Sequence, residues 1–188
     1  MLKERTLILI KPDAVQRGLA GEILKRFEQK ALKVIGIKMV KPDKSVIENH
    51  YTLDLEWAEN VGRKTKQAFK EKGIEIDKAE VDIGKEVRQK LINSLHSQPV
   101  IAIVLEGYHA VEIVRKIVGH TEPRQAMPGT IRGDFSVDSY ALGDERNRSV
   151  KNLVHAADSR KNAEREIAVW FKETDLVDYE RPEEKAAH

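Results

Sequence analysis

The stretch of sequence that most suggests chemistry is NLVHAADS, residues 152–159, in which a histidine ends a short apolar run. The imidazole of His155 is largely neutral at pH 7, because the reference pKa of histidine is about 6.5. Such a ring can pack in the protein, bind a metal or act as a nucleophile. As a nucleophile toward phosphorus it needs one free nitrogen and a partner that fixes the tautomer from the other side. Glu166, two helical turns beyond Ser159, could be that partner or simply a surface charge.

Metal-binding and nucleotide-binding motifs of the usual kinds are missing from the sequence. The six histidines form no i, i+4 pair and no HExxH motif, and the chain has no cysteine. The segment Gly62-Arg63-Lys64-Thr65 does not satisfy the phosphate-loop pattern Gly-x4-Gly-Lys-Ser/Thr. No Gly-x-Gly-x-x-Gly follows an expected strand either. A nucleotide would therefore have to bind without either loop.

Polar side chains near the ends of expected strands and helices could bind phosphate instead. They are Lys11, Arg115, Thr121 and Arg132, the last of which we expect in a rigid loop bounded by Pro and Gly, PGTIRGD. The planar guanidinium of arginine suits phosphate oxygens, lysine adds a point charge, and a threonine hydroxyl adds a neutral donor. Each of these residues alone is more often a solvated side chain than a ligand. Together they would bind a polyphosphate, provided that the fold brings them to one place.

The elements that must position these side chains follow from the hydrophobic pattern. We expect strands at 6–10, 32–40 and 99–105, and a brief strand ending at His155. In the second strand apolar residues such as Ile37 and Met39 alternate with Lys33 and Lys38, so we expect one face, with the lysines, to be solvated. Amphipathic helices are expected at 20–31 and at 109–118, the latter ended by Gly119, and a short helix should carry His50 and Tyr51. Ser159 should cap a last helix, whose inward residues are Ala163, Ile167, Trp170 and Phe171.

The order of these elements is β-α-β, an interruption, then β-α-β. It predicts an α+β fold, a ferredoxin-like four-stranded antiparallel sheet with helices packed on one face. A doubly wound parallel sheet is the competing topology. The interruption, residues 54–86, is too long for an ordinary loop and should contain helices of its own. We expect one domain over residues 1–188, with a helical insertion at 54–86 and a tail at 172–188.

The amino-acid composition excludes few classes of function, but it indicates where in the cell the protein is found. The formal net charge of +2, from 33 basic and 31 acidic side chains, neither requires nor excludes nucleic acid. The apolar run from Leu7 to Ile10 is too short for a signal sequence or a membrane span. With no cysteine in the chain, we expect a cytoplasmic protein without a membrane partner.

Several segments, taken in order, resemble the nucleoside diphosphate kinases. The match runs through RTLILIKPDAVQRGLAGEILKRFEQKALKVIGIKMV, HY, PVIAIVLEG, VRKIVGHTEP, PGTIRGDF, NLVHAADS, AEREIAVWF and LVDY. The most specific of them are IKPDAVQRG, PGTIRGD and the Asn-x-x-His-x-x-Asp-Ser block. The resemblance implies a ferredoxin-like enzyme that moves the terminal phosphoryl group of a nucleoside triphosphate, such as ATP, to a nucleoside diphosphate. It also implies a phosphohistidine and Mg²⁺ held mainly by the nucleotide phosphates.

The resemblance further implies a role for each matching position. His155 would be the nucleophile and Glu166 its orienting carboxylate, with Lys11 and Tyr51 also taking part in catalysis. The residues expected around the phosphates are Lys11, Tyr51, Arg115, Thr121 and Arg132. Asn152 and Lys11 would meet the ribose hydroxyls. Members of this family form hexamers or tetramers, so a homo-oligomer with broad tolerance of the base is expected.

Three features depart from the family pattern. Ala157 stands where the family usually has a serine, so a hydroxyl near Glu166 is lost. Val87 stands at the position of the base-stacking phenylalanine, which leaves Trp57, Phe69 and Val87 as candidates for gripping the base. The loop at 133–151 is longer than usual, so its contact with the base is not assigned.

Two alternatives stay open at this point. The insertion at 54–86 is either a solvated helical excursion or a lid or assembly contact beside the site. The whole chain could also be a binding module for nucleic acid or a protein, which its Lys-rich insertion and basic isoelectric point would suit. The intact set of expected site residues argues against the binding module.

Overall fold

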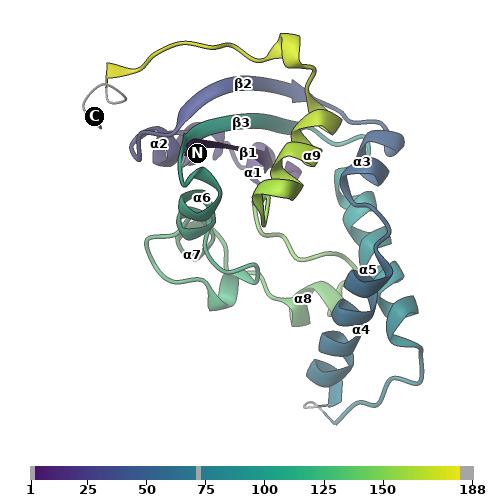
Figure 1. The fold of residues 1–188 in the computed structure, drawn as a ribbon. Coiled ribbons are helices and arrows are strands. Elements are labelled where there is room, and N and C mark those ends of the chain that lie inside the picture. Colours follow the sequence, from purple (N-terminus) through teal and green to yellow (C-terminus); the bar gives the residue numbers. More distant parts are fainter. Residues whose placement is uncertain (1–2, 71–72, 183–188) are drawn as a thin grey trace.

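The computed structural model describes residues 3–70 and 73–182, which form one four-stranded sheet with helices around it (Figure 1). The strands are β1 (Lys3–Ile10), β2 (Lys33–Val40), β3 (Val100–Tyr108) and β4 (Val154–Ala156). They lie in the order β2-β3-β1-β4, and each neighbouring pair is antiparallel. This is the expected ferredoxin-like arrangement, and it excludes the parallel alternative.

Helices cover both faces of the sheet, so the prediction of helices on one face was wrong. Ile8 and Ile10 of β1 pack on one side, against α2 (Ala20–Glu28) and α6 (Ala110–Val118). Leu7 and Leu9 point to the other side, where α3 (Lys44–His50), α5 (Glu80–Leu95) and α9 (Arg160–Trp170) cover them. Successive side chains of a strand face opposite ways, so an uninterrupted apolar strand needs a cover on each face.

The ends of the helices follow local rules. Gly119 ends α6 with φ of 87°, a conformation that favours glycine, and a Cβ there would lie 2.4 Å from Thr130 Oγ1. The Ser159 hydroxyl accepts a hydrogen bond from the Asn162 N–H and caps α9, as expected. In the first half of the chain, α2 ends at Glu28, three residues earlier than its periodicity suggested.

The long interruption does contain helices. Helix α4 (Leu55–Lys70) lies within the predicted segment 54–86, whereas α5 begins in it at Glu80 and continues beyond it to Leu95. The two helices form a hairpin that extends away from the sheet at the lower right of Figure 1. The two helices meet at glycines: a Cβ on Gly62 would lie 1.9 Å from Glu80 O, and one on Gly84 2.1 Å from Ala58 O. The contact between α4 and α5 therefore requires glycine at both positions.

Shorter elements complete the connections. They are α1 (Pro12–Gln16), α7 (Ile131–Phe135), α8 (Tyr140–Glu145) and two single turns, η1 (Pro123–Gln125) and η2 (Glu173–Asp175). Arg132 was expected in a rigid loop and lies instead on α7, whose N-cap Thr130 accepts from the Gly133 N–H. None of the helices in the part of the chain described is long and apolar enough to cross a membrane.

The described part of the predicted tail lies along the edge strand β2, at the top of Figure 1. The Val177 N–H donates to Ile35 O at 2.7 Å, and the Tyr179 hydroxyl donates to Val34 O at 2.9 Å. Residues 183–188 of the predicted tail lie outside the described residues. The tail helps to bury Lys33, whose ammonium donates to Tyr179 O. The prediction for the solvated face of β2 was therefore wrong: Lys33 is buried, while Ile37 and Met39 are exposed.

Candidate active site

Strand β4 presents His155 from a backbone that is tied to the end of β1. Leu153, just before the strand, has a positive φ of 68°, a conformation that costs a side chain about 1–3 kcal/mol. Its N–H donates to Asp13 Oδ2 at 3.0 Å, and its carbonyl accepts from the Lys11 N–H at 2.8 Å. These bonds hold the strained turn and fix where His155 emerges. The strand runs one residue past His155, to Ala156, so the predicted end was one residue short.

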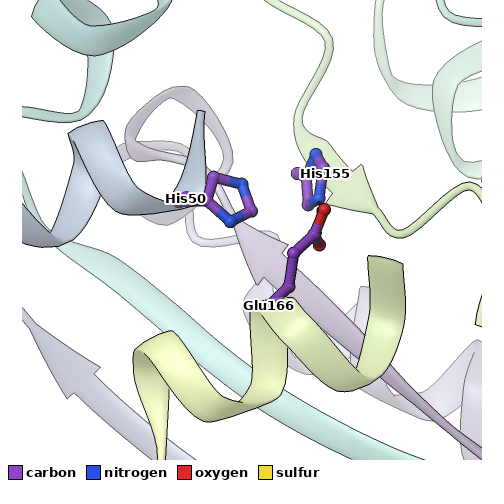
Figure 2. A group of neighbouring side chains, drawn as sticks. All are labelled: His50, His155 and Glu166. Carbon is purple, nitrogen blue, oxygen red and sulfur yellow. Dashed lines mark hydrogen bonds and ion pairs between the residues drawn. The ribbon is translucent and has the colours of Figure 1, made fainter. Parts of the chain in front are cut away.

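Glu166 reaches back from α9 to the imidazole of His155 (Figure 2). Its Oε2 lies 2.8 Å from His155 Nε2, and the carboxyl group is buried. Burial raises the pKa of Glu166 to about 7. Burial, and then the charges of Lys11 and Arg132, lower the pKa of His155 to about 3, so the ring is neutral. When Glu166 is ionised, Nε2 donates to it and Nδ1 is left with the free lone pair.

A second histidine, His50, lies against His155 and was not among the expected site residues. The two ring centroids are 4.4 Å apart with an angle of 81° between the ring planes. The Trp170 indole N–H donates to His50 Nδ1 at 3.3 Å, so the proton of the neutral ring is on Nε2. That Nε2 is buried and has no hydrogen-bond partner in the structure as described. The signal available in the sequence was the position of His50 directly before Tyr51.

His50, His155 and Glu166 are also the group within residues 3–70 and 73–182 that could hold a metal, since their ligand atoms lie within 4.8 Å of one another (Figure 2). Two imidazoles and one carboxylate do not suit Mg²⁺, which prefers oxygen ligands in an octahedral arrangement. The tautomer of His50 also places an N–H, rather than a lone pair, at Nε2. These residues therefore do not fit a resident Mg²⁺.

The polar side chains opposite the ring form one hydrogen-bonded network. Lys11 Nζ donates to Asn152 Oδ1 at 2.8 Å, and Asn152 Nδ2 donates to Thr121 O at 2.9 Å. Arg132 donates to three backbone carbonyls, those of Asn152, Gly119 and Val154, at 3.0, 2.9 and 2.6 Å. A guanidinium has five N–H groups, so Arg132 keeps two for a ligand.

Burial shapes the charges of this network. It lowers the pKa of Lys11 to about 8 and that of Arg132 to about 10, so both groups are cationic at neutral pH. Burial also raises the pKa of Tyr51 above its ordinary value, so its hydroxyl stays protonated and can donate. The site therefore offers two buried cations and a neutral donor around a neutral imidazole.

All eight site residues expected from the sequence line one cavity of about 380 Å³. They are Lys11, Tyr51, Arg115, Thr121, Arg132, Asn152, His155 and Glu166. The α4–α5 hairpin closes one side of the cavity with Trp57, Arg88 and Leu91, together with Asp54 just before α4. Of the three candidates for gripping the base, Trp57 lines this cavity, whereas Phe69 and Val87 are not among its described lining residues.

Comparison with protein families gives a match to the nucleoside diphosphate kinase model over residues 4–71 and 77–176. The chain belongs to the nucleoside diphosphate kinase family. Curated nucleoside diphosphate kinases are similar along almost their whole length. The enzyme of Pyrobaculum aerophilum is 46% identical over 93% of this chain and 98% of its own. The enzyme of Pyrococcus furiosus is 41% identical over 94% of this chain and 88% of its own.

Solved structures of nucleoside diphosphate kinases share the fold. The crystal structure of the Pyrobaculum aerophilum kinase has a TM-score of 0.90 at 45% identity, over 94% of this chain and all of that one. A Borrelia burgdorferi nucleoside diphosphate kinase, solved as a transition-state mimic with vanadate and ADP, has a TM-score of 0.81 at 35% identity. This match covers 99% of the present chain and 97% of the Borrelia burgdorferi chain. This nucleoside diphosphate kinase is therefore an enzyme that transfers phosphoryl groups between nucleotides.

Proposed function

We propose that this kinase works in two half-reactions through a phosphohistidine at His155. In the first, His155 Nδ1 attacks the γ-phosphorus of a nucleoside triphosphate, the bond from that phosphorus to the β–γ bridging oxygen breaks, and the diphosphate leaves. In the second, a terminal oxygen of another diphosphate attacks the phosphohistidine, and the P–N bond breaks. The observation that carries this proposal is the 2.8 Å contact between His155 Nε2 and Glu166, which leaves Nδ1 unprotonated when Glu166 is ionised.

The surrounding side chains have the chemistry that phosphoryl transfer needs. The reaction depends mainly on positioning and on stabilising the charge of the phosphoryl oxygens. Lys11, Arg115 and Arg132 would supply cations, while Thr121 and the Tyr51 hydroxyl would supply neutral donors, all in the same cavity. Asn152 and Lys11, joined by a 2.8 Å hydrogen bond, would meet the ribose hydroxyls.

Mg²⁺ would enter this site on the nucleotide. Because His50, His155 and Glu166 do not suit that ion, the phosphates of the bound nucleoside triphosphate would hold it. The vanadate and ADP bound to the Borrelia burgdorferi relative support a nucleotide-phosphate site in this fold. The substrates would thus be nucleoside triphosphates and diphosphates with Mg²⁺.

The hairpin would complete the site on the side of the base. The indole of Trp57 lines the cavity with Leu91, so it offers a flat surface on which any base can stack. A stacking contact of this kind tolerates different bases, which agrees with broad substrate use. We further expect a homo-oligomer, hexamer or tetramer, in the cytoplasm, as proposed from the sequence.

Labelling with [γ-³²P]ATP and Mg²⁺ tests this function. The wild-type chain should acquire an acid-labile, alkali-stable label, and His155→Ala should acquire none. His96→Ala is the matched control, because His96 is exposed and lies outside the cavity lining, and its label should equal that of the wild type. Label that persists in His155→Ala would contradict the assignment. We do not expect nucleic-acid binding as the main role, because the expected site residues line one cavity.

A further inference from the structure

Glu166 has two carboxylate oxygens, and each faces a different partner. Oε2 contacts His155, while Oε1 lies 3.5 Å from the guanidinium Nη2 of Arg165. Arg165 precedes Glu166 on α9, and its side chain is 37% exposed. Ala157 offers no side-chain donor and packs with Val111 and Ala163. The polar contact described for Oε1 is therefore the one to Arg165.

Arg165 also binds the C-terminal end of α3, which carries His50 and Tyr51. Its Nη1 donates to Asn49 O at 2.9 Å and its Nη2 to His50 O at 3.2 Å. The last carbonyls of a helix have no partner within the helix, and cations are favourable there. One guanidinium thus joins Glu166, behind the imidazole of His155, to the helix end that packs on that imidazole.

Arg88 of α5 binds the same helix end. Its Nε donates to Tyr51 O at 2.6 Å and its Nη2 to Glu48 O at 3.3 Å. Arg88 and Arg165 together bind four consecutive carbonyls, at residues 48–51. No contact between Arg88 and Glu166 is seen in the part of the chain that is described. Arg88 therefore serves as a natural control for the bracing of α3 alone.

The charges around Glu166 single out Arg165. Burial opposes ionisation of the carboxyl group, and the charge of Asp158, in the turn before α9, opposes it too. A charged His50 on α3 would favour ionisation, but burial lowers the pKa of His50 well below its ordinary value, so that ring is neutral. His155 on β4 is neutral for the same reason, and the Tyr51 hydroxyl is protonated. Among these neighbours Arg165 carries the permanent positive charge.

We propose that Arg165 is a positioning residue for phosphoryl transfer: it holds Glu166 as a carboxylate that accepts the Nε2 proton of His155 and so keeps Nδ1 free to attack. The role of Nδ1 rests on the function proposed above. The effect of Arg165 on Glu166 and on the tautomer does not, because both exist in the free protein.

The proposal predicts a change in the titration of the site. A cation within about 4–6 Å lowers the pKa of a carboxyl group by about 1–3 units, and a partly exposed cation gives the lower end of that range. In Arg165→Met, the midpoint for Glu166 should therefore rise by about one pH unit. The ionised fraction at pH 7 would fall from about half to about a tenth, so phosphorylation of His155 would slow about fivefold. The defect should disappear above about pH 9, where both proteins are ionised.

Imidazole ¹⁵N NMR of the nucleotide-free protein tests the proposal without any activity measurement. The His155 nitrogens are assigned with His155→Gln and followed from pH 5 to pH 10 in wild type, Arg165→Met, Arg165→Lys and Arg88→Met. The change from the Nε2–H form should have its midpoint about one unit higher in Arg165→Met. Arg165→Lys keeps the charge and should stay close to the wild type. Arg88→Met, which loosens the same end of α3, should also leave the midpoint in place.

Two results would overturn the proposal. One is an unchanged midpoint in folded Arg165→Met, with folding checked by circular dichroism. The other is an equal shift in Arg88→Met, which would show that bracing of α3 is responsible. If Arg165→Met does not fold, Arg165→Gln, which keeps a donor for the helix end but no charge, takes its place with the same expected shift. A shifted midpoint in a protein whose His155 takes no label would support this role for Arg165 while contradicting the phosphohistidine.

Discussion

Replacing Glu166 by glutamine gives a direct test of the imidazole–carboxylate pair. The amide has the same shape but no charge, so the 2.8 Å contact with His155 Nε2 loses its ionic acceptor. The amide nitrogen of glutamine can also donate to Nε2, which would move the ring proton to Nδ1 and block the attacking atom. Under the proposed mechanism both effects would slow the phosphorylation of His155, and the cations proposed to bind phosphate would stay in place.

The size of the effect follows from the environment of the pair. The Glu166 side chain is 7% exposed, so solvent screens the contact little. A buried hydrogen bond to a charged group contributes about 1.5–3 kcal/mol. If the transition state loses all of it, phosphorylation slows about 10- to 150-fold. The wild type should show an acid limb near pH 7 from the titration of Glu166, and this limb should disappear in the variant, because the amide does not titrate.

Rapid-quench measurement of a single turnover with [γ-³²P]ATP isolates this step from product release. The rate constant for label incorporation is measured from pH 5.5 to pH 9 in wild type and Glu166→Gln, with thermal unfolding as the control for folding. A rate within twofold of wild type, or an acid limb that persists in the variant, would refute the reasoning.

Three other substitutions test the rest of the site. Arg132→Met removes the donors to three backbone carbonyls and should lower the free energy of unfolding in urea by about 3 kcal/mol. A loss of less than about 1 kcal/mol would show that these hydrogen bonds contribute little to stability. Because burial lowers the pKa of Lys11 to about 8, the nucleotide KM should rise about tenfold from pH 7 to pH 9, and Lys11→Arg should abolish that rise. The pKa of Lys11 is lower in the folded than in the unfolded protein, so between about pH 8 and 10.5 the unfolded chain binds more protons. The free energy of unfolding in urea should therefore rise with pH across this range, and a value that does not change with pH would contradict the burial of Lys11. Trp57→Ala, and deletion of residues 57–84, should raise the KM for every nucleotide about tenfold at similar kcat, and an unchanged KM would remove the hairpin from the site.

Much of this fold could be predicted from the sequence because its signals are local. Apolar runs predicted β1 and β3, Gly119 and Ser159 marked helix ends, and the order of elements predicted the antiparallel sheet. The errors arose where distant segments meet. The second face of the sheet is covered by α3, α5 and α9, and Lys33 of β2 is buried by contacts that include the tail. The pattern of apolar residues within a strand does not show which distant helix or tail segment packs on it.

Some residues of the site could likewise be predicted from the sequence, and others could not. Family resemblance named eight residues, and the structure brings all of them to one cavity. It did not find His50 as a neighbour of His155, nor Arg88 and Arg165 as donors to the carbonyls at the end of α3. Arg165 and His50 are 115 positions apart in the sequence, and neither lies at a spacing typical of a motif. Their relation arises from the packing of α3 against α9, which only the folded chain displays.

Isolation and chase of the phosphorylated protein test the central claim most directly. The chain is incubated with [γ-³²P]ATP and Mg²⁺, freed of nucleotide, and mixed with an unlabelled diphosphate of another base such as GDP. We predict one label per active chain, located on Nδ1 of His155 by ³¹P NMR and peptide mapping, and its complete transfer to GDP to give labelled GTP. Label on another residue, or label on His155 that GDP does not remove, would contradict the account.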